Sequence, residues 1–344
     1  MNKGYRLSLI LSLSLILSLS LILWLEGASG SEAQGGGRTG GTNRNGSAAA
    51  PVISGFVVDD LGDTLRVSVP PQRIVSLAPS NTELLFAMGL GHRLVGVTDV
   101  CNYPAAADSI DKVAGYSSLN AERIVAVAPD LVLAARGNDL EGLQTLRELD
   151  IPVFALAISS VEELFGAIER LGRLCGSVPE AAALETRFRR RVEAVDARAV
   201  AASGRPGVIW CYWGDPVYTA GRGTMIDHLI QRAGGRNVAR AAPGSWPQVS
   251  VESVLSWSPE VIITSYLPDG PESLADELAR LRTMAGWKSL PAVISERVYY
   301  LDADIMSRPG PRSIDALEML VSLLHPNQEE LGQEEADQEE VKQK

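Results

Sequence analysis

Residues 179–202 read PEAAALETRFRRRVEAVDARAVAA, a run with no glycine and no internal proline. Its apolar residues recur at helical spacing: Leu184, Phe188, Val192 and Val195. Pro179 suits the first turn of a helix, where its missing N–H costs no hydrogen bond. At 1.5 Å per residue the run would form a rod of roughly 35 Å, longer than an ordinary crossover helix. We therefore expect residues 177–204 to form one long helix that links two lobes and limits their relative motion.

Short apolar strands alternate with amphipathic helices on both sides of this rod, which is typical of an α/β protein with parallel sheets. Before the rod, the sequence predicts strands at 73–77, 93–97, 130–134 and 152–156 and helices at 80–89, 140–149 and 161–174. After it, the predicted strands are 207–212, 217–220, 260–264 and 297–301, and the helices are 224–233, 272–284 and 314–324. The two lobes would then span residues 51–176 and 205–326.

The first predicted helix has a recognisable start. Ser80-Asn-Thr-Glu83 has the pattern of a capping box, in which the serine oxygen and the glutamate satisfy opposite free N–H groups. Gly89 is suited to end the same helix, because glycine readily adopts the left-handed conformation.

Two segments that lie 130 residues apart share one pattern. NAERIVAVAPDLVL occupies residues 120–133 and SVESVLSWSPEVII occupies residues 250–263. Each contains a capping residue, a glutamate two positions later, a short helix, a proline followed by an acid, and a buried strand. One copy on each side of the rod indicates two equivalent lobes. The positive end of a helix would by itself explain Glu122 and Glu252, but it leaves open a shared outward role.

The N-terminal residues predict export. Lys3 and Arg6 precede an apolar run, Leu7–Leu25, and small residues follow, so residues 1–30 have the layout of a secretory signal. The run is also long enough to span a bilayer as an uncleaved anchor, and no cysteine near residue 30 offers the usual lipoprotein anchoring site. Residues 31–50 read as a flexible Gly/Ser-rich tether. Either way, we expect the folded part outside the cytoplasm, in the periplasm or at the cell surface.

The net charge is −11, so the chain has no excess of basic residues for binding the phosphates of a nucleic acid. We therefore expect no nucleic-acid partner. Residues 327–344 contribute −5 of that charge, from seven acids and two lysines. Such a polar, acidic run cannot bury a core, so we interpret it as a disordered solvated tail.

The sequence lacks the motifs typical of catalytic sites and of metal sites. It contains no nucleophile elbow, zinc-protease motif, phosphate-binding loop or dinucleotide fingerprint, which predicts a protein that is not an enzyme and holds no cofactor. The cysteines Cys101, Cys175 and Cys211 are odd in number and read as small buried hydrophobes. The three histidines are scattered singly, whereas a zinc site needs convergent ligands.

Aromatic residues gather where predicted strands end and loops begin: Tyr103, Tyr116, Tyr212, Trp213, Tyr218, Trp246 and Tyr266. In α/β sheets ligands bind beyond the carboxyl ends of strands, and flat apolar ligands favour aromatic walls with a few polar groups. Any one of these rings could instead fill the core or the rim. Trp213 and Trp246, flanked by Gly and Pro in loops, are the ones we expect to bind ligand.

Five segments resemble the periplasmic vitamin B12-binding proteins of ATP-binding-cassette (ABC) importers: RIVSLAPSNTE at 73–83, VGVT at 95–98, NAERIV at 120–125, PDLV at 129–132 and WPQVSVE at 246–252. The resemblance covers roughly Pro70 to Leu324. The glutamate and Pro-acid elements are shared with relatives that bind iron siderophores and haem, so they indicate only the superfamily. Trp246-Pro-Gln-Val-Ser and Arg136-Gly137 are more similar to the cobalamin branch.

The resemblance implies an α/β fold of two Rossmann-like lobes with parallel sheets, joined by one long α-helix, with the ligand in the cleft between them. It implies that Tyr116, Trp246, Asp304 and Arg308 line the cleft, with Tyr103 and Tyr212 nearby, and that Glu122 and Glu252 face the permease. Three features depart from the family. Ala135 replaces a frequent tryptophan, Val100 replaces a cleft tyrosine, and Ala233 and Val321 stand where a cystine is expected.

We therefore expect an extracytoplasmic, monomeric substrate-binding protein that captures a corrinoid, cobalamin or cobinamide, and delivers it to a permease dimer with its ATPase subunits. Haem and a ferric siderophore are the alternative ligands. The scarcity of histidine weakens the haem alternative, and the shortage of cleft arginines beyond Arg308 and Arg136 weakens the siderophore alternative. A surface-anchored scaffold or adhesion protein is the alternative of another class.

Overall fold

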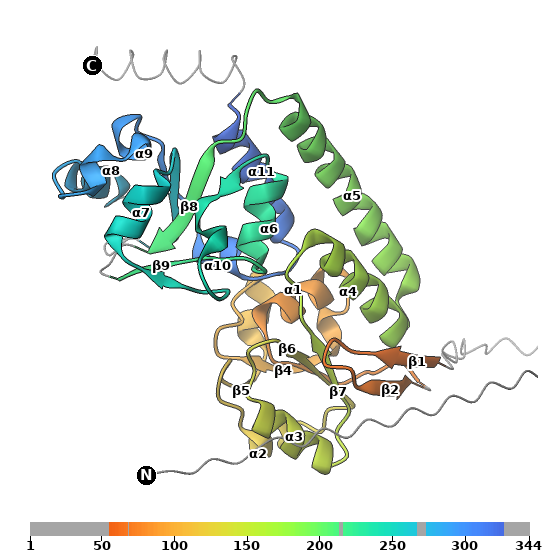
Figure 1. Ribbon diagram of the computed structural model, residues 1–344. Helices are drawn as coiled ribbons and strands as arrows, with labels where there is room; N and C mark the ends of the chain where they lie inside the picture. Colours follow the sequence, from red (N-terminus) through yellow and green to blue (C-terminus); the bar gives the residue numbers. More distant parts are fainter. Residues whose placement is uncertain (1–54, 68, 213–215, 267–272, 327–344) are drawn as a thin grey trace, which may run out of the picture. The chain divides into compact units, whose positions relative to one another are not determined.

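The computed structural model describes residues 55–67, 69–212, 216–266 and 273–326, which belong to one compact unit (Figure 1). The predicted signal or anchor, the tether, the acidic tail and Trp213 lie outside the described residues. None of the described helices has the length and apolar character of a membrane-crossing segment.

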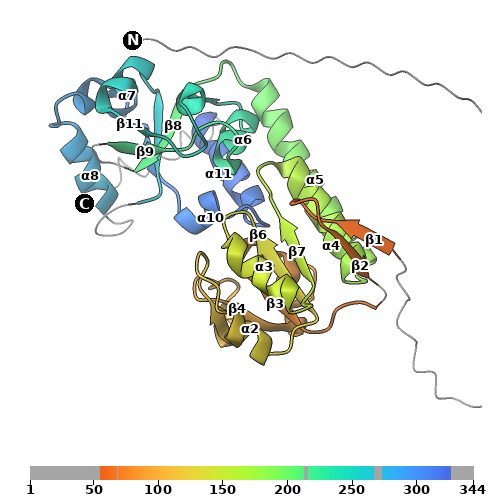
Figure 2. The ribbon, with the colours of Figure 1, turned by 60° about the horizontal axis from the view of Figure 1, so that its bottom comes forward.

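The N-terminal lobe is built on a five-stranded parallel sheet in the order β5-β4-β3-β6-β7. The strands are β3 (Ile74–Ser76), β4 (Leu94–Thr98), β5 (Lys112–Ala114), β6 (Leu131–Ala135) and β7 (Val153–Leu156). Helices α1 (Pro79–Ala87) and α4 (Val161–Leu174) cover one face, and α2 (Ala121–Ala126) and α3 (Leu140–Glu148) cover the other (Figures 1 and 2). Alternate strand residues point to opposite faces, so Leu131 joins one hydrophobic cluster and Val132 the other.

The C-terminal lobe has a mixed sheet in the order β11-β9-β8-β12-β13, with β10 beside β8. Its strands are β8 (Gly207–Tyr212), β9 (Val217–Thr219), β10 (Arg236–Asn237), β11 (Gln248–Val249), β12 (Val261–Thr264) and β13 (Val298–Tyr300). Its helices are α6 (Met225–Arg232), α7 (Val251–Trp257), α8 (Leu274–Leu281), α9 (Pro291–Ile294), α10 (Ala303–Ser307) and α11 (Ser313–Leu324). The expected parallel pairing is confirmed for β8, β12 and β13. Strand β9 is antiparallel to β8, because the few residues between them are too short for a crossover.

Helix α5 (Val178–Ala201) is the predicted rod, 24 residues long. It packs against α4 of the first lobe and α11 of the second (Figure 1). Its buried stripe contains the predicted Leu184, Phe188, Val192 and Val195.

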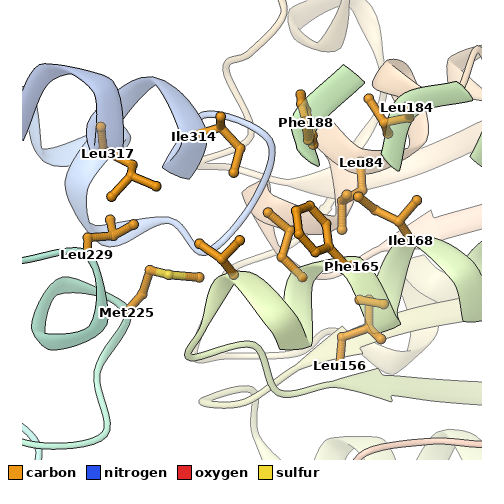
Figure 3. Close-up of a cluster of buried hydrophobic side chains, with 14 of the residues drawn as sticks. Leu84, Leu156, Phe165, Ile168, Leu184, Phe188, Met225, Leu229, Ile314 and Leu317 are labelled. Atoms are coloured by element: carbon orange, nitrogen blue, oxygen red, sulfur yellow. The ribbon is translucent and has the colours of Figure 1, made fainter. Parts of the chain in front are cut away.

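One hydrophobic cluster runs without a break from the first lobe through α5 into the second (Figure 3). Leu84 of α1 and Ile168 of α4 belong to it, together with Leu229 of α6 and Leu317 of α11, and all four are fully buried. Arg232 of α6 adds a polar link, since it contacts Glu162 of α4 and binds both carboxylate oxygens of Asp196 in α5 at 2.9 Å. Separating the lobes would expose apolar surface to water, which opposes a wide hinge motion.

The internal repeat of the sequence is also a structural repeat. Ala128 and Ser258, 130 residues apart, both adopt left-handed φ angles of 43° and 49° between a short helix and a strand. The acid that follows each proline ties the start of that strand to the start of its neighbour in the sheet, β3 in the N-terminal lobe and β8 in the C-terminal lobe. Asp130 accepts hydrogen bonds from the N–H groups of Gln72 and Arg73, at 2.7 and 2.9 Å, and Glu260 accepts one from Gly207 at 2.8 Å.

The capping-box prediction at Ser80–Glu83 is wrong. Helix α1 starts at Pro79 with Ala78 as its N-cap, and no side chain caps it. Proline at the first helical position sets the start earlier, so Ser80 lies inside the helix. Glu83 instead reaches across to Arg312 of the other lobe, because a guanidinium is a stronger partner for a carboxylate than a backbone N–H.

Three further features bear on the predictions made from the sequence. The hairpin of β1 (Gly55–Val58) and β2 (Thr64–Val67) was not predicted. The three cysteines are buried, as predicted, and none of them forms a disulfide. Ala233 and Val321, which replace the expected cystine, are both buried in the shared cluster.

The shared cluster predicts that damage in one lobe will unfold the other. The four tryptophans that the structure describes, at 210, 246, 257 and 287, all lie in the C-terminal lobe. Leu84→Ala, in the N-terminal lobe, should reduce the free energy of unfolding by about 2–5 kcal/mol and shift the urea transition seen by tryptophan fluorescence.

Val200→Ala is the control, because Val200 on α5 is 86% exposed and its change should cost less than about 0.5 kcal/mol. Independent lobes would leave the fluorescence transition of Leu84→Ala in place while circular dichroism shows a separate, earlier loss of structure.

Candidate ligand-binding site

A pocket of about 670 Å³ is lined by residues of both lobes. From the N-terminal lobe, residues 78–81 follow β3, and residues 135–137 are the last residue of β6 and the two that follow it. These two strands are neighbours at the point where the strand order reverses, which is where open α/β sheets bind ligands. From the C-terminal lobe come the start of α6 at residues 223–226, residues 245–246, and residues 306–309.

Among the described residues, Tyr116 and Trp246 are the aromatic side chains that line the pocket. Trp246 is 43% exposed and lies parallel to Tyr218, with ring centroids 6.1 Å apart, and edge-on to Trp210 at 6.0 Å. Tyr116 donates a hydrogen bond from its hydroxyl to the carbonyl of Arg136 at 2.8 Å. Burial raises the pKa of the Tyr116 phenol above its ordinary value, so this group is neutral at physiological pH.

Asn138 holds the N-terminal side of the pocket together, and sequence reasoning missed it. Its side-chain amide donates to the carbonyls of Leu77 and Tyr116 at 2.9 and 2.8 Å and accepts from the N–H of Ala135 at 2.7 Å. A buried amide bonded on both sides fixes three segments of backbone. The only sequence signal was its place in Arg136-Gly137-Asn138, directly after a strand.

The predicted Tyr212 lies behind the pocket rather than in its lining. Its ring is 4.9 Å from Trp210, 6.1 Å from Tyr218 and 5.9 Å from Tyr266, centroid to centroid. This cluster supports Trp246 from behind, because Tyr218 lies against both Tyr212 and Trp246. Tyr212 is therefore near the ligand site without lining it.

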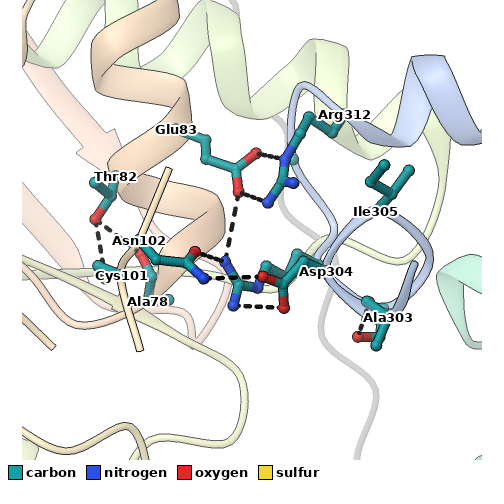
Figure 4. A network of polar contacts seen from close by, with 12 residues as sticks. Ala78, Thr82, Glu83, Cys101, Asn102, Ala303, Asp304, Ile305 and Arg312 are labelled. Carbon is teal, nitrogen blue, oxygen red and sulfur yellow. Dashed lines mark hydrogen bonds and ion pairs between the residues drawn. The ribbon is translucent and has the colours of Figure 1, made fainter. Parts of the chain in front are cut away.

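The predicted Asp304 and Arg308 take part in a polar network between the lobes (Figure 4). Arg308 lines the pocket, but it donates to Asn102 Oδ1 at 2.6 Å and pairs with Asp304 Oδ1 at 2.5 Å. Asn102 Nδ2 donates in turn to Asp304 Oδ2 at 3.1 Å. Asp304 is not among the lining residues, nor is Tyr103, whose ring lies 4.3 Å from the Arg312 guanidinium.

The lining carries little charge. Among the described residues that line it, Arg136 and Arg308 are the only charged ones, and serine, threonine, asparagine and apolar side chains form most of the rest. Among the described residues, no group of three or more histidines, cysteines or acids is placed to hold a metal ion. Such a lining fits a bulky, mainly neutral ligand with hydrogen-bonding groups.

Glu122 and Glu252 lie in the first turns of α2 and α7 and are exposed, away from the pocket lining. Asn120 and Ser250 cap these helices by accepting from Arg123 N at 2.9 Å and Ser253 N at 3.3 Å. Hydrogen bonds from its own backbone N–H and from Ser250 lower the pKa of Glu252, so its carboxylate is charged at neutral pH.

A family model described as periplasmic binding protein matches residues 74–305. The chain belongs to the periplasmic binding protein family. A vitamin B12-binding protein of Vibrio parahaemolyticus is 30% identical to it over 250 residues, 72% of this chain and 87% of the relative. An uncharacterised ABC transporter substrate-binding lipoprotein of Bacillus subtilis is 30% identical over 278 residues, 78% of this chain and 85% of the relative.

Solved structures agree with this family assignment. The crystal structure of the periplasmic vitamin B12-binding protein of Vibrio cholerae has a TM-score of 0.66 and 30% identity, and the match covers 74% of this chain and 97% of that one. The periplasmic haem-binding protein of Roseiflexus, in apo form, has a TM-score of 0.65 and 27% identity over 74% and 98% of the two chains. This binding protein thus has the two-lobed α/β fold expected from its sequence.

The backbone at Gly137 gives a testable constraint on the pocket of this binding protein. Gly137 has a φ of +102°, and a Cβ built there would lie 2.8 Å from the Tyr116 hydroxyl. Gly137→Ala should therefore cost roughly 1–3 kcal/mol of unfolding free energy and displace Tyr116 from the wall.

Gly166→Ala is the matched control. Gly166 lies within α4, and an added Cβ there would meet no atom within 4 Å, so this change should stabilise by up to about 1 kcal/mol. Equal unfolding midpoints for the two variants in urea would contradict the constraint.

Proposed function

We propose that the chain is the extracytoplasmic substrate-binding subunit of an ABC importer and that it binds a corrinoid, such as cobalamin or cobinamide. The observation that carries the proposal is the pocket itself, which has one aromatic ring from each lobe and little charge. The vitamin B12-binding relatives support the same ligand. A pocket of about 670 Å³ lined by both lobes favours ligand capture over a scaffold or adhesion role.

Haem is the main alternative, because haem-binding proteins share the fold. Haem iron is held in proteins by histidine, cysteine, tyrosine or methionine. Within the part of the chain that the structure describes, the lining contains no histidine or cysteine, and its methionines, Met225 and Met306, are packed in the shared cluster with at most 5% exposed. The phenol of Tyr116 is engaged by a carbonyl and resists ionisation. A corrinoid brings its own ligated cobalt, so it does not require such a group.

A ferric siderophore is disfavoured by charge. Anionic iron chelates are best bound by several cations, since each would offset part of the cost of desolvating the ligand. Of the two cationic residues in the lining, Arg308 is already paired with Asp304. Arg136 alone would face a multiply charged anion.

Isothermal titration of the purified protein with cyanocobalamin, cobinamide, haemin and ferric siderophores tests the ligand. We expect both corrinoids to bind and the others to bind far more weakly. Trp246→Ala should weaken corrinoid binding by about 2 kcal/mol, roughly 30-fold, as expected for an aromatic anchor. The melting temperature should barely change, because a half-exposed ring leaves no core cavity.

Tyr266→Ala is the control, since Tyr266 is 56% exposed and belongs to the aromatic cluster but not to the lining. Tight binding of haemin alone would overturn the corrinoid proposal. Unchanged corrinoid affinity with a lowered melting temperature in Trp246→Ala would assign that ring to packing instead.

We further propose that Glu122 and Glu252 dock the protein on its permease. Each lies at the same place in its copy of the repeat, exposed and outside the pocket. Two equivalent acids suit a permease made of two like subunits, each of which offers a basic site. Charge pairs desolvated at an interface contribute far more than exposed pairs.

Glu122→Lys combined with Glu252→Lys should abolish ligand-stimulated ATPase activity of the transporter in liposomes and leave corrinoid affinity intact. Each single substitution should reduce the ligand-stimulated ATPase activity only in part. Glu180→Lys with Asp276→Lys is the matched control, because both acids are exposed in the first turns of other helices, α5 and α8. Equal ATPase stimulation by the two double variants would reduce the glutamates to partners of the helix dipole.

A further inference from the structure

The segment that runs from Asp302 to Arg312 belongs to the C-terminal lobe, yet much of its polar surface is committed to the N-terminal lobe. We call it the clasp. Arg312 at its end makes a two-pronged ion pair with Glu83 of α1, with Nη2–Oε1 at 2.6 Å and Nε–Oε2 at 3.0 Å (Figure 4). Glu83 is almost fully buried, with 1% of its side chain exposed.

A second contact holds the middle of the clasp. Arg308 donates to Asn102, a residue of the loop after β4, at 2.6 Å, and Asn102 donates to Asp304 at 3.1 Å. Arg308 Nη1 also lies 3.9 Å from Glu83 Oε1. The single carboxylate of Glu83 therefore faces both arginines of the clasp.

Backbone packing completes the attachment. A Cβ added to Gly310 would lie 3.2–3.3 Å from backbone and side-chain atoms of Ser80, so the clasp meets α1 at very close range. Residues 306–309 of the clasp and residues 78–81 of the N-terminal lobe line the same pocket. The polar contacts and the pocket wall are thus parts of one junction.

From this junction we propose that Glu83 and Asn102 are positioning residues for ligand capture. They hold the clasp on the N-terminal lobe and fix the direction of Arg308, so that the pocket wall is formed before the ligand arrives. Neither residue needs to touch the ligand. A wall built in advance spares the ligand the ordering of that segment, which favours tight binding.

The test combines binding kinetics with a distance measurement, and its binding arm rests on the corrinoid proposal. Glu83→Gln and Asn102→Ala should each speed cyanocobalamin dissociation at least tenfold in stopped-flow experiments. Spin labels at Ser117→Cys and Lys288→Cys, exposed positions in the two lobes, should show a broader distance distribution in the ligand-free variants than in the parent. Cyanocobalamin should narrow that distribution again. The three native cysteines are buried, which limits background labelling.

Glu318→Gln is the control, because Glu318 forms the same two-pronged pair with Arg191, at 2.7 and 2.6 Å, between α11 and α5 and outside the pocket lining. It should lower the melting temperature without changing dissociation or distances. If Glu83→Gln and Asn102→Ala behave as Glu318→Gln does, the network is structural only and the proposal fails. Asn102 lies in an exposed loop, so its variant keeps the test open should Glu83→Gln not fold. If the parent protein does not bind cyanocobalamin, the proposed ligand fails, and the ligand-free distance distributions alone decide the positioning role.

Discussion

Leu156, Met225 and Met306 belong both to the hydrophobic cluster that joins the lobes and to the lining of the pocket. Helix α5 and the cluster set the spacing between the two sheets, and the pocket exists only at that spacing. The hydrophobic effect is non-directional and scales with the area removed from water, so it can hold two lobes together without specifying what lies at their rim. The arrangement of the rim is instead determined by polar groups, whose hydrogen bonds have a defined geometry. Here they are Asn138 beneath Tyr116 and the arginines beside α1.

The duplicated halves do not contribute equally to the site. Each lobe has an equivalent short helix, a residue in the left-handed conformation after that helix, and an acid whose hydrogen bonds join two strands. In the N-terminal lobe the sheet is fully parallel and places its strand ends directly at the pocket. In the C-terminal lobe the antiparallel strands β9 and β11 occupy one edge of the sheet, and their neighbourhood supplies the stacked rings behind Trp246. The repeated unit is thus alike in the two lobes, whereas their contributions to the pocket differ.

Much of the fold could be predicted because the regular spacing of apolar residues along the sequence indicates helices and strands locally. Helix α4 matched its predicted range, 161–174, and α5 (Val178–Ala201) begins one residue and ends three residues inside its predicted range, 177–204, since uninterrupted apolar spacing leaves few alternatives. The hairpin β1–β2 lacked such a signal, because its strands are only four residues long. Glu83 was assigned to the wrong partner for a related reason. Its local pattern fits a cap, and nothing nearby in the sequence announces Arg312, which lies 229 positions away.

In the candidate site too, residues with a local sequence signal could be predicted, whereas those that depend on distant parts of the chain could not. Tyr116, Trp246 and Arg308 could be named in advance and line the pocket, because loops after strands and a family resemblance both indicated them. Asp304 was also expected to line the cleft but lies outside the pocket lining, as do Tyr103 and Tyr212, which were expected nearby. Asn138 was missed altogether. Its role depends on backbone groups of three separate segments that only the folded chain brings together.

The buried thiols have a consequence for where this protein can mature. Cys101, Cys175 and Cys211 are all the cysteines in the chain, and none forms a disulfide. Burial raises the pKa of Cys175 to about 12 and raises that of Cys211 as well, so neither presents the thiolate that reacts with oxidants or other thiols. Ala233 and Val321 are both buried in the shared cluster as apolar side chains. Because all three thiols are buried and unpaired, the fold contains no disulfide, and the polypeptide can reach it without any thiol oxidase.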